Sequence, residues 1–202
     1  MKSFIMNLIK EINLLWTPVY PYLAKQIEEV YGRKDGDILD IGPFCGLIFN
    51  FIENNIGNSF TIGTFPEGMG LSFLEEARKK GFEKMVRILE TDPSLKGIEN
   101  QKIDLAIFRG AFFFPSLFEV DFKAIDRVLK PKGVAFIGGG FGKFTPEEII
   151  RKIGKRSRQL NLEIGKIEIS ENEILKNISK ATLKANFEII KEGGLWVLLR
   201  KD

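Results

Sequence analysis

The stretch Asp37-Ile-Leu-Asp-Ile-Gly-Pro-Phe-Cys-Gly46 decides the fold, because a short apolar run leads into a turn that carries two glycines. Gly42 and Gly46 can adopt positive φ and have no Cβ, so main-chain N–H groups in the turn can face a ligand. Asp40 stands at the carboxyl end of the run, where open α/β sheets bind ligands. The stretch predicts a strand, a ligand-facing turn and a helix, although many two-glycine turns hold no ligand.

Composition sets the bounds on domain number and function class. The chain has 202 residues, 44% of them hydrophobic, which predicts one domain over residues 1–202. A net charge of +3 is small for a dedicated nucleic-acid protein, so we expect a small-molecule partner. The chain has no histidine, which excludes Ser-His-Asp and Cys-His hydrolases, and we expect no metal site. The single cysteine, Cys45, fits a reducing, cytoplasmic setting.

Short apolar runs alternate with segments of helical length, which predicts βαβ units and a parallel sheet with helices on both faces. A turn at Glu192-Gly-Gly194 joins two further runs that resemble a β-hairpin. The fold class is therefore α/β, a Rossmann-like doubly wound, mostly parallel sheet that ends in an antiparallel β-hairpin. The expected strands are 37–41, 60–65, 86–90, 105–108, 134–138, 187–191 and 195–200, and the expected helices between the parallel strands are 47–54, 70–80 and 122–129.

Two N-terminal capping patterns mark further helices near the end of the chain. Thr145-Pro-Glu-Glu148 reads as an N-cap, a first-turn proline and a capping-box glutamate, and Ser170-Glu-Asn-Glu173 repeats the box. The segment Lys143–Lys166 carries about four surplus positive charges on a predicted helical pair. A solvated face is the default interpretation, and an acidic partner or RNA surface is the alternative.

The motifs, in this order, resemble those of class I S-adenosylmethionine-dependent methyltransferases of the small single-domain, type 11-like kind, from about Tyr20 to Asp202. The glycine turn is similar to the family's first motif, and the last motif is similar to its helix-turn before the fifth strand. The motifs that carry the resemblance are Asp40-Ile-Gly-Pro-Phe-Cys-Gly46, Ile62-Gly-Thr-Phe65 with Leu74-Glu-Glu-Ala-Arg-Lys-Lys80, Leu89-Glu-Thr-Asp92, Asp104-Leu-Ala-Ile-Phe-Arg-Gly110 and Ile125-Asp-Arg-Val-Leu-Lys-Pro-Lys-Gly133. The resemblance implies S-adenosylmethionine as the cofactor.

Two positions depart from the family pattern. Phe44 stands at the middle position of the first motif, where the family usually has a glycine. Phe65 stands where the family usually places the carboxylate that binds both ribose hydroxyls, and Glu67 lies two residues further along the loop. A ribose without that acceptor loses charge-assisted hydrogen bonds of roughly 1.5–3 kcal/mol. We expect weakened or rearranged cofactor binding.

The candidate cofactor-binding residues each have a structural alternative. Asp40 either contacts the ligand or bonds loop amides, and Asp92 either lies near the adenine, as the resemblance implies, or forms an Asp-Pro turn. Arg109 follows a buried strand, and it either pairs with a helix or binds an anionic group. The full candidate set is Asp40, Gly42, Phe44, Gly46, Phe65, Glu67, Asp92 and Arg109 for the cofactor, with Tyr20 and Arg109 as the catalytic candidates.

Aromatic and apolar segments suggest where a substrate is enclosed. One ring of Ala111-Phe-Phe-Phe-Pro115 is expected to line an apolar substrate pocket. Residues 1–34 are interpreted as a helical lid segment and 35–202 as the α/β core, with Trp16 and Tyr20 folding over the cofactor or packing in the core. The stripe Phe4, Ile5, Leu8, Ile9, Ile12 and Leu15 has helical spacing and is expected to cover the sheet or the cofactor rather than a membrane.

The first function hypothesis is a methyltransferase acting on a small or medium, partly apolar acceptor. The second is a catalytically degenerate methyltransferase-fold module that binds a ligand or a protein, and Phe44 and Phe65 favour it. A third, RNA modification, depends on the basic segment near the C-terminus. The sequence leaves open the acceptor and the oligomeric state.

Overall fold

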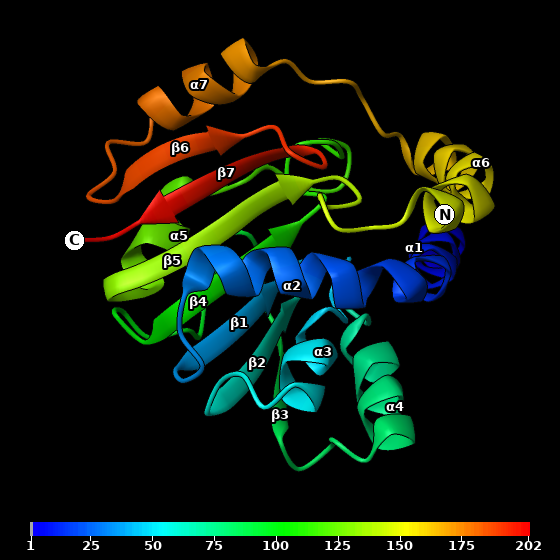
Figure 1. Ribbon diagram of the computed structural model, residues 1–202, viewed down its shortest axis with the longest axis horizontal. Helices are drawn as coiled ribbons and strands as arrows, with labels where there is room; N and C mark the ends of the chain where they lie inside the picture. The colour runs from blue at the N-terminus through cyan, green and yellow to red at the C-terminus, as the bar shows by residue number, and fades with distance from the viewer. Residues whose placement is uncertain (1) are drawn as a thin grey trace.

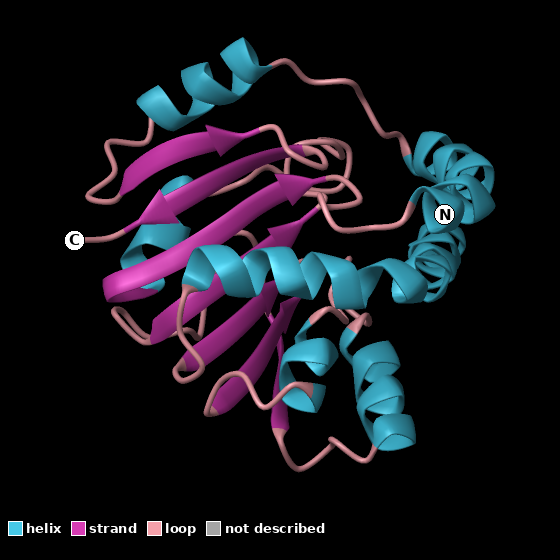
Figure 2. Cartoon of the chain, in the orientation of Figure 1, coloured by secondary structure: helices cyan, strands magenta, loops and turns pink. Residues whose placement is uncertain are grey.

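The computed structural model describes residues 2–202 and, for Lys2, only the backbone. It contains a seven-stranded sheet in the order β3-β2-β1-β4-β5-β7-β6 (Figures 1 and 2). The first five strands pair in parallel, and β7 pairs antiparallel with both β5 and β6, so the predicted fold class is confirmed. The strands are β1 (Asp37–Ile41), β2 (Ser59–Thr64), β3 (Val86–Glu90), β4 (Ile103–Arg109), β5 (Leu129–Gly139), β6 (Asn186–Ile190) and β7 (Leu195–Arg200).

Helices cover both faces of the sheet. In Figure 1, α2 crosses the near face of the sheet and α5 lies behind it. All seven residues of β4 are buried, because this central strand has a neighbouring strand on each side and helices above and below. The helices are α1 (Lys2–Trp16), α2 (Tyr20–Tyr31), α3 (Ile48–Glu53), α4 (Gly70–Lys80), α5 (Phe122–Val128), α6 (Glu147–Ile164) and α7 (Glu171–Ser179), with a 3-10 turn at Thr17–Val19.

Helices α1 and α6 pack together beyond the carboxyl ends of the parallel strands (Figure 1). The buried face of α1 differs from the predicted stripe. Phe4 is exposed and Leu15 is half-buried, whereas Asn13 and Trp16 are buried. The reason is that α1 packs against α6 and the glycine turn, so its contact face follows those neighbours as well as its own apolar residues. Met1, the first residue of the predicted segment, lies outside the described residues.

Two predicted boundaries are corrected by the structure. Pro146, not Thr145, is the N-cap of α6, and the Thr145 hydroxyl instead donates a hydrogen bond to the carbonyl oxygen of Phe141. The predicted helix-turn around Pro131 is part of β5, which begins directly after α5 and accommodates the segment by a register shift and a φ of 63° at Lys132. The capping box at Ser170 is confirmed.

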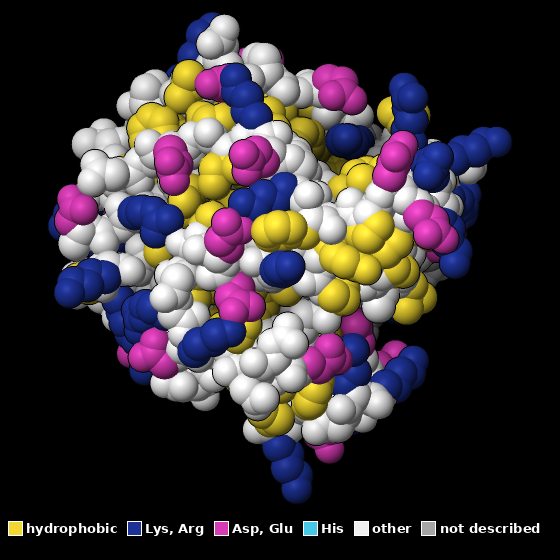
Figure 3. Space-filling model, viewed as in Figure 1, with side chains coloured by type: hydrophobic (Ala, Val, Ile, Leu, Met, Phe, Trp, Pro, Cys, Tyr) yellow, Lys and Arg dark blue, Asp and Glu magenta, His cyan; other side chains and the backbone are white. Residues whose placement is uncertain are grey.

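The basic segment forms one 18-residue helix, α6, rather than the predicted pair. Lysine and arginine side chains gather over this helix at the right margin of Figure 3. Helix α2 was not assigned as a separate helix from the sequence. No helix among residues 2–202 has the length and apolar character that crossing a membrane requires.

Candidate functional site

The glycine turn after β1 is built on a buried carboxylate. Gly42 and Gly46 adopt φ of 96° and 120°, in the left-handed region that favours glycine. Asp40 Oδ2 accepts hydrogen bonds from the amides of Gly46 (3.0 Å) and Ile48 (3.2 Å), which fixes the turn against the start of α3. Asp40 Oδ1 has no partner among the described residues. Burial raises the pKa of Asp40 to about 6, although the two amides and Arg109 oppose the shift.

Phe44 turns inward from the middle of the turn and is 2% exposed. Its ring lies 4.7 Å from that of Phe114, measured between centroids, and rests against the backbone of Gly110. A Cβ at Gly110 would stand 2.6 Å from the Phe44 ring, so the close approach requires a glycine there. The phenyl group therefore packs between the turn and the loop after β4.

Arg109, the last residue of β4, is buried behind this ring. Its Nε donates to the carbonyl oxygen of Phe44 at 3.1 Å, and its Nη2 donates to Asn13 Oδ1 at 3.2 Å and to the Tyr20 hydroxyl at 2.6 Å. Asn13 also donates from Nδ2 to the carbonyl oxygen of Pro43 at 2.9 Å. Asn13 thus links α1 to both the turn and β4.

Tyr20 contacts Arg109 and does not line the cavity described below. Burial raises the pKa of its hydroxyl, and the coulombic effect of Arg109 opposes this shift without reversing it. The phenol stays protonated at neutral pH and donates to the carbonyl oxygen of Asn13 at 3.3 Å. In this arrangement Tyr20 orients Arg109 and is not available as a proton acceptor.

Three rings fill the corner at the end of β2. Phe65 packs edge-on against Phe108 and Phe118, at centroid distances of 5.9 and 5.3 Å, and the three side chains are buried. We call Phe65, Phe108 and Phe118 the ring cluster. Glu67 is exposed on the following loop. The position that the family usually gives to a ribose-binding carboxylate is therefore apolar in this chain.

The carboxylates of Asp92 and Glu90 accept hydrogen bonds from nearby loops. Asp92 Oδ1 accepts from both the amide and the hydroxyl of Ser94, which is the arrangement of an Asp turn. Glu90, which the sequence reasoning missed, accepts from the amides of Gly68 and Gly70 at 2.9 and 3.1 Å. It ties the loop after β2 to the end of β3.

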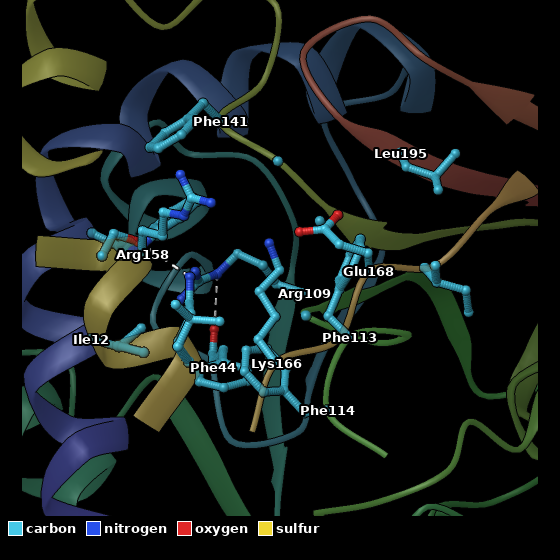
Figure 4. Close-up of a pocket in the computed structure, with 18 of the residues that line it drawn as sticks. Ile12, Phe44, Arg109, Phe113, Phe114, Phe141, Arg158, Lys166, Glu168 and Leu195 are labelled. Atoms are coloured by element: carbon cyan, nitrogen blue, oxygen red, sulfur yellow. Dashed lines mark hydrogen bonds between the residues drawn. The ribbon is translucent and has the colours of Figure 1, made fainter. Parts of the chain in front are cut away.

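A cavity of about 600 Å³ opens beside Phe44 and Arg109, at the carboxyl ends of β4 and β5. In Figure 4 the rings of Phe113, Phe114 and Phe141 surround it together with charged side chains. Helix α1 contributes Ile12 and Trp16 to the lining, and α6 contributes residues that include Ser157 and Arg158. Among the candidate residues named from the sequence, Phe44 and Arg109 line this cavity, whereas Asp40, Gly42, Gly46, Phe65, Glu67, Asp92 and Tyr20 do not.

Solved structures with similar folds include several methyltransferases. A provisionally assigned S-adenosyl-L-methionine-dependent methyltransferase from Methanococcus maripaludis superposes with a TM-score of 0.76 at 26% identity, over 97% of this chain and 91% of that one. The chain has the class I methyltransferase fold. The resemblance found in the sequence is thereby confirmed, and the strand order with its antiparallel last pair is the feature that both share.

Two further methyltransferase structures agree in fold at lower identity. A SAM-dependent methyltransferase from Aquifex aeolicus gives a TM-score of 0.63 at 17% identity, over 95% of this chain and 96% of that one. Geranyl diphosphate C-methyltransferase from Streptomyces coelicolor, in complex with S-adenosyl-L-homocysteine, gives 0.60 at 14%, over 88% and 73%. No family model and no curated protein matches the chain.

The residues at the carboxyl ends of β1 and β2 differ in how well they suit a nucleotide cofactor. The turn offers glycine backbone and Asp40 Oδ1, a buried acceptor without a partner among the described residues. At the end of β2 the ring cluster stands where a ribose-binding carboxylate is expected. The glycine backbone of the turn suits a nucleotide ligand, whereas the ring cluster offers no acceptor for ribose hydroxyls.

The sequence reasoning missed Asn13, Phe141, Arg158 and Lys166. A lone asparagine among the apolar residues of α1 was a usable signal, since a buried polar side chain needs partners. Phe141, Arg158 and Lys166 carried no such signal. They reach the cavity only because α6 and the segment after it fold back over the strand ends.

Proposed function

We propose that the chain is an S-adenosylmethionine-dependent methyltransferase acting on a small or medium, partly apolar acceptor. The observation that supports this most is the cavity beside the first-motif turn of a class I methyltransferase fold, at the ligand-binding edge of the sheet. A bound small molecule in the geranyl diphosphate C-methyltransferase structures supports the size class of the acceptor.

S-adenosylmethionine, when bound, supplies an electrophilic methyl group on a sulfonium. The chain's own contribution is then to position the acceptor and exclude water, which the rings of Phe44, Phe113 and Phe114 do by enclosing the cavity. Tyr20 remains protonated, and Glu168 is the one carboxylate among the described residues that line the cavity. The acceptor is therefore one that needs little help from a general base.

The N-terminal segment, residues 1–34, acts as a lid in this proposal. Trp16 stacks on Phe141 with ring centroids 4.7 Å apart and donates to the Ser157 hydroxyl at 2.8 Å. These contacts join α1 to α6 across one side of the cavity. Opening the pair would admit a ligand, and closing it would shield the reaction from water.

Calorimetric titration with S-adenosylhomocysteine tests the proposal. We expect saturable binding to the wild-type protein, and no heat of binding at millimolar ligand would refute the function. Phe65→Leu is expected to bind S-adenosylhomocysteine about fivefold more tightly than the wild type, because admitting the ribose then breaks fewer ring contacts and one ring contact contributes about 1 kcal/mol. Phe60→Leu, near the start of β2, is the matched control and should leave the affinity unchanged.

The second candidate is a methyltransferase-fold binding module without catalysis, and the ring cluster favours it. In that case the cavity binds a ligand, while the corner at the end of β2 stays closed to the cofactor. Transfer of a labelled methyl group from S-adenosylmethionine to any component of a metabolite extract would exclude this candidate.

A further inference from the structure

Arg109 is a buried cation without a carboxylate partner. It is 4% exposed, and every group that accepts a hydrogen bond from it is neutral: the Phe44 carbonyl, the Asn13 amide oxygen and the Tyr20 hydroxyl. Within residues 2–202 it forms no ion pair at 4.0 Å or less. Buried arginines are nearly always paired, because removing a charge from water costs several kcal/mol unless an opposite charge compensates.

The environment of Arg109 holds the guanidinium in place without an ion pair, although its charge opposes the rise in the pKa of the buried Asp40. The guanidinium carbon lies 5.0 Å from the ring centroid of Trp16, 4.8 Å from that of Tyr20 and 5.8 Å from that of Phe44. These faces attract the cation and fix its plane, but they carry no net charge. Nη1 donates to none of the described residues, and the side chain lines the cavity. A preformed donor group therefore faces the cavity.

Two more cations surround the same space. Arg158 reaches the cavity from α6, and Lys166 reaches it from the segment that follows (Figure 4). Neither forms an ion pair with a residue that the structure describes, and Lys166 Nζ lies 5.1 Å from the ring centroid of Phe113. Glu168 is the acidic residue of the described lining, so three cations face one carboxylate. The local charge is positive although the chain as a whole is nearly neutral.

The remaining wall of the cavity is apolar. Phe113, Phe114 and Phe141 present their rings, and Ile12, Leu162 and Leu195 present aliphatic side chains. A volume of about 600 Å³ accommodates a molecule of metabolite size. A ligand that matches both parts of this wall has an anionic group and an apolar body.

We propose that the cavity binds an amphipathic organic anion, whose carboxylate or phosphate accepts hydrogen bonds from Arg109 and whose apolar body lies along the phenylalanine rings. Arg158 and Lys166 attract the anion at the exposed side of the cavity. This assignment rests on the proposed function, in which the anion is the methyl acceptor. The competing source of the same chemistry is the carboxylate of the cofactor itself.

A matched pair of probes, 4-phenylbutyrate and the neutral 4-phenylbutanamide, tests the assignment by calorimetry without any methyl transfer. The carboxylate is expected to bind wild-type protein at least about tenfold more tightly than the amide, as charge-assisted hydrogen bonds exceed neutral ones. Arg109→Met is expected to remove this preference, and Arg109→Lys to retain part of it. Equal affinities of the two probes for the wild type would overturn the assignment.

Variants of Arg158 and Lys166 test the proposal independently, in case the Arg109 variants fail to fold. The double variant Arg158→Gln, Lys166→Gln is expected to weaken 4-phenylbutyrate severalfold and leave 4-phenylbutanamide unchanged. The double variant Arg151→Gln, Lys152→Gln changes two exposed positions of α6 outside the cavity; it is the control for net charge and should change neither affinity. An effect of the cavity double variant no larger than that of this control would contradict the proposal.

The two sources of the anion are separated by adding S-adenosylhomocysteine. If the anion site belongs to the acceptor, 4-phenylbutyrate binds equally well to protein saturated with S-adenosylhomocysteine. Mutual exclusion of the two ligands, with Arg109→Met weakening both, would overturn the assignment in favour of the cofactor carboxylate. Absence of S-adenosylhomocysteine binding with the probe preference intact would refute the proposed function alone.

Discussion

Asp40→Asn should change how the stability of the protein depends on pH. The wild-type carboxylate is fully buried, and burial raises its pKa from 3.8 to about 6. Between these pH values the native state holds more protons than the unfolded state, so the contribution of Asp40 to stability increases as the pH falls. The full window of about two pKa units corresponds to about 3 kcal/mol.

Asparagine removes this contribution while retaining most of the geometry. Its amide oxygen can still accept from Gly46 and Ile48, and its NH₂ group takes the place of Oδ1, which already lacks a partner. The unpartnered amide destabilises the variant by a constant amount of about 1–3 kcal/mol. The pH-dependent difference between the two proteins remains on top of this offset.

Urea unfolding of wild type and variant at pH 7, 6, 5 and 4.5 measures the effect. We expect the wild type to gain stability relative to Asp40→Asn as the pH is lowered, by about 2 kcal/mol at pH 4.5, which is roughly two thirds of the full window. Asp92→Asn is the control, since the hydrogen bonds from Ser94 lower the pKa of the exposed Asp92 and give the opposite sign. A free-energy difference that stays constant between pH 7 and 4.5 would refute the reasoning about Asp40.

Two further variants test the packing around the site and the ion pair at the amino ends of β4 and β5. Gly110→Ala should lower the unfolding free energy by roughly 1–3 kcal/mol, because Gly110 has a φ of 77° and a Cβ there would meet the Phe44 ring. Gly154→Ala, on α6 with open space around the added Cβ, is the control and should stabilise the protein. Thermal unfolding compares the two variants with the wild type. Lys130→Met should move acid unfolding to higher pH. Burial opposes a lower pKa for Asp104, but Lys130, 2.6 Å away, holds the pKa of that carboxylate below its usual value. The stabilisation from the ionised Asp104 therefore lasts to lower pH in the wild type and is lost only as the pH falls through this lowered pKa. Identical midpoints of acid unfolding for wild type and variant, followed by circular dichroism, would contradict this.

Most of the strands were predictable because their signals are local. Apolar runs bounded by glycine and proline fix β1, β3 and β7 at the expected residues, and the alternation with helical segments implies a parallel sheet. The limits of β5 were not predictable. Pro131 and Gly133 read as a turn in the sequence, but Leu129 and Val134 on either side of them both pair with β4, and the register shifts between the two pairs.

The candidate site was only partly predictable, because its residues come from distant segments. Phe44 and Arg109 stood out from the sequence, one as a departure from a motif and the other as a charge after a buried strand. Their direct contact, and the contacts of Arg109 with Asn13 and Tyr20, span up to 96 residues of chain. Spacing along the sequence carries no information about such contacts.

The sequence by itself determined the class I sheet, the glycine turn at the end of β1 and the phenylalanine at position 65, where the resemblance implies a ribose-binding carboxylate. These features follow from the residue types and their spacing along the chain, which can be read directly from the sequence. Only the tertiary structure decided that Phe65 packs into a ring cluster, that Tyr20 stays protonated behind Arg109, and that α1 and α6 enclose a cationic, apolar cavity. Burial and charge at these positions arise from neighbours brought together by folding, and for that reason the tertiary structure alone decides them.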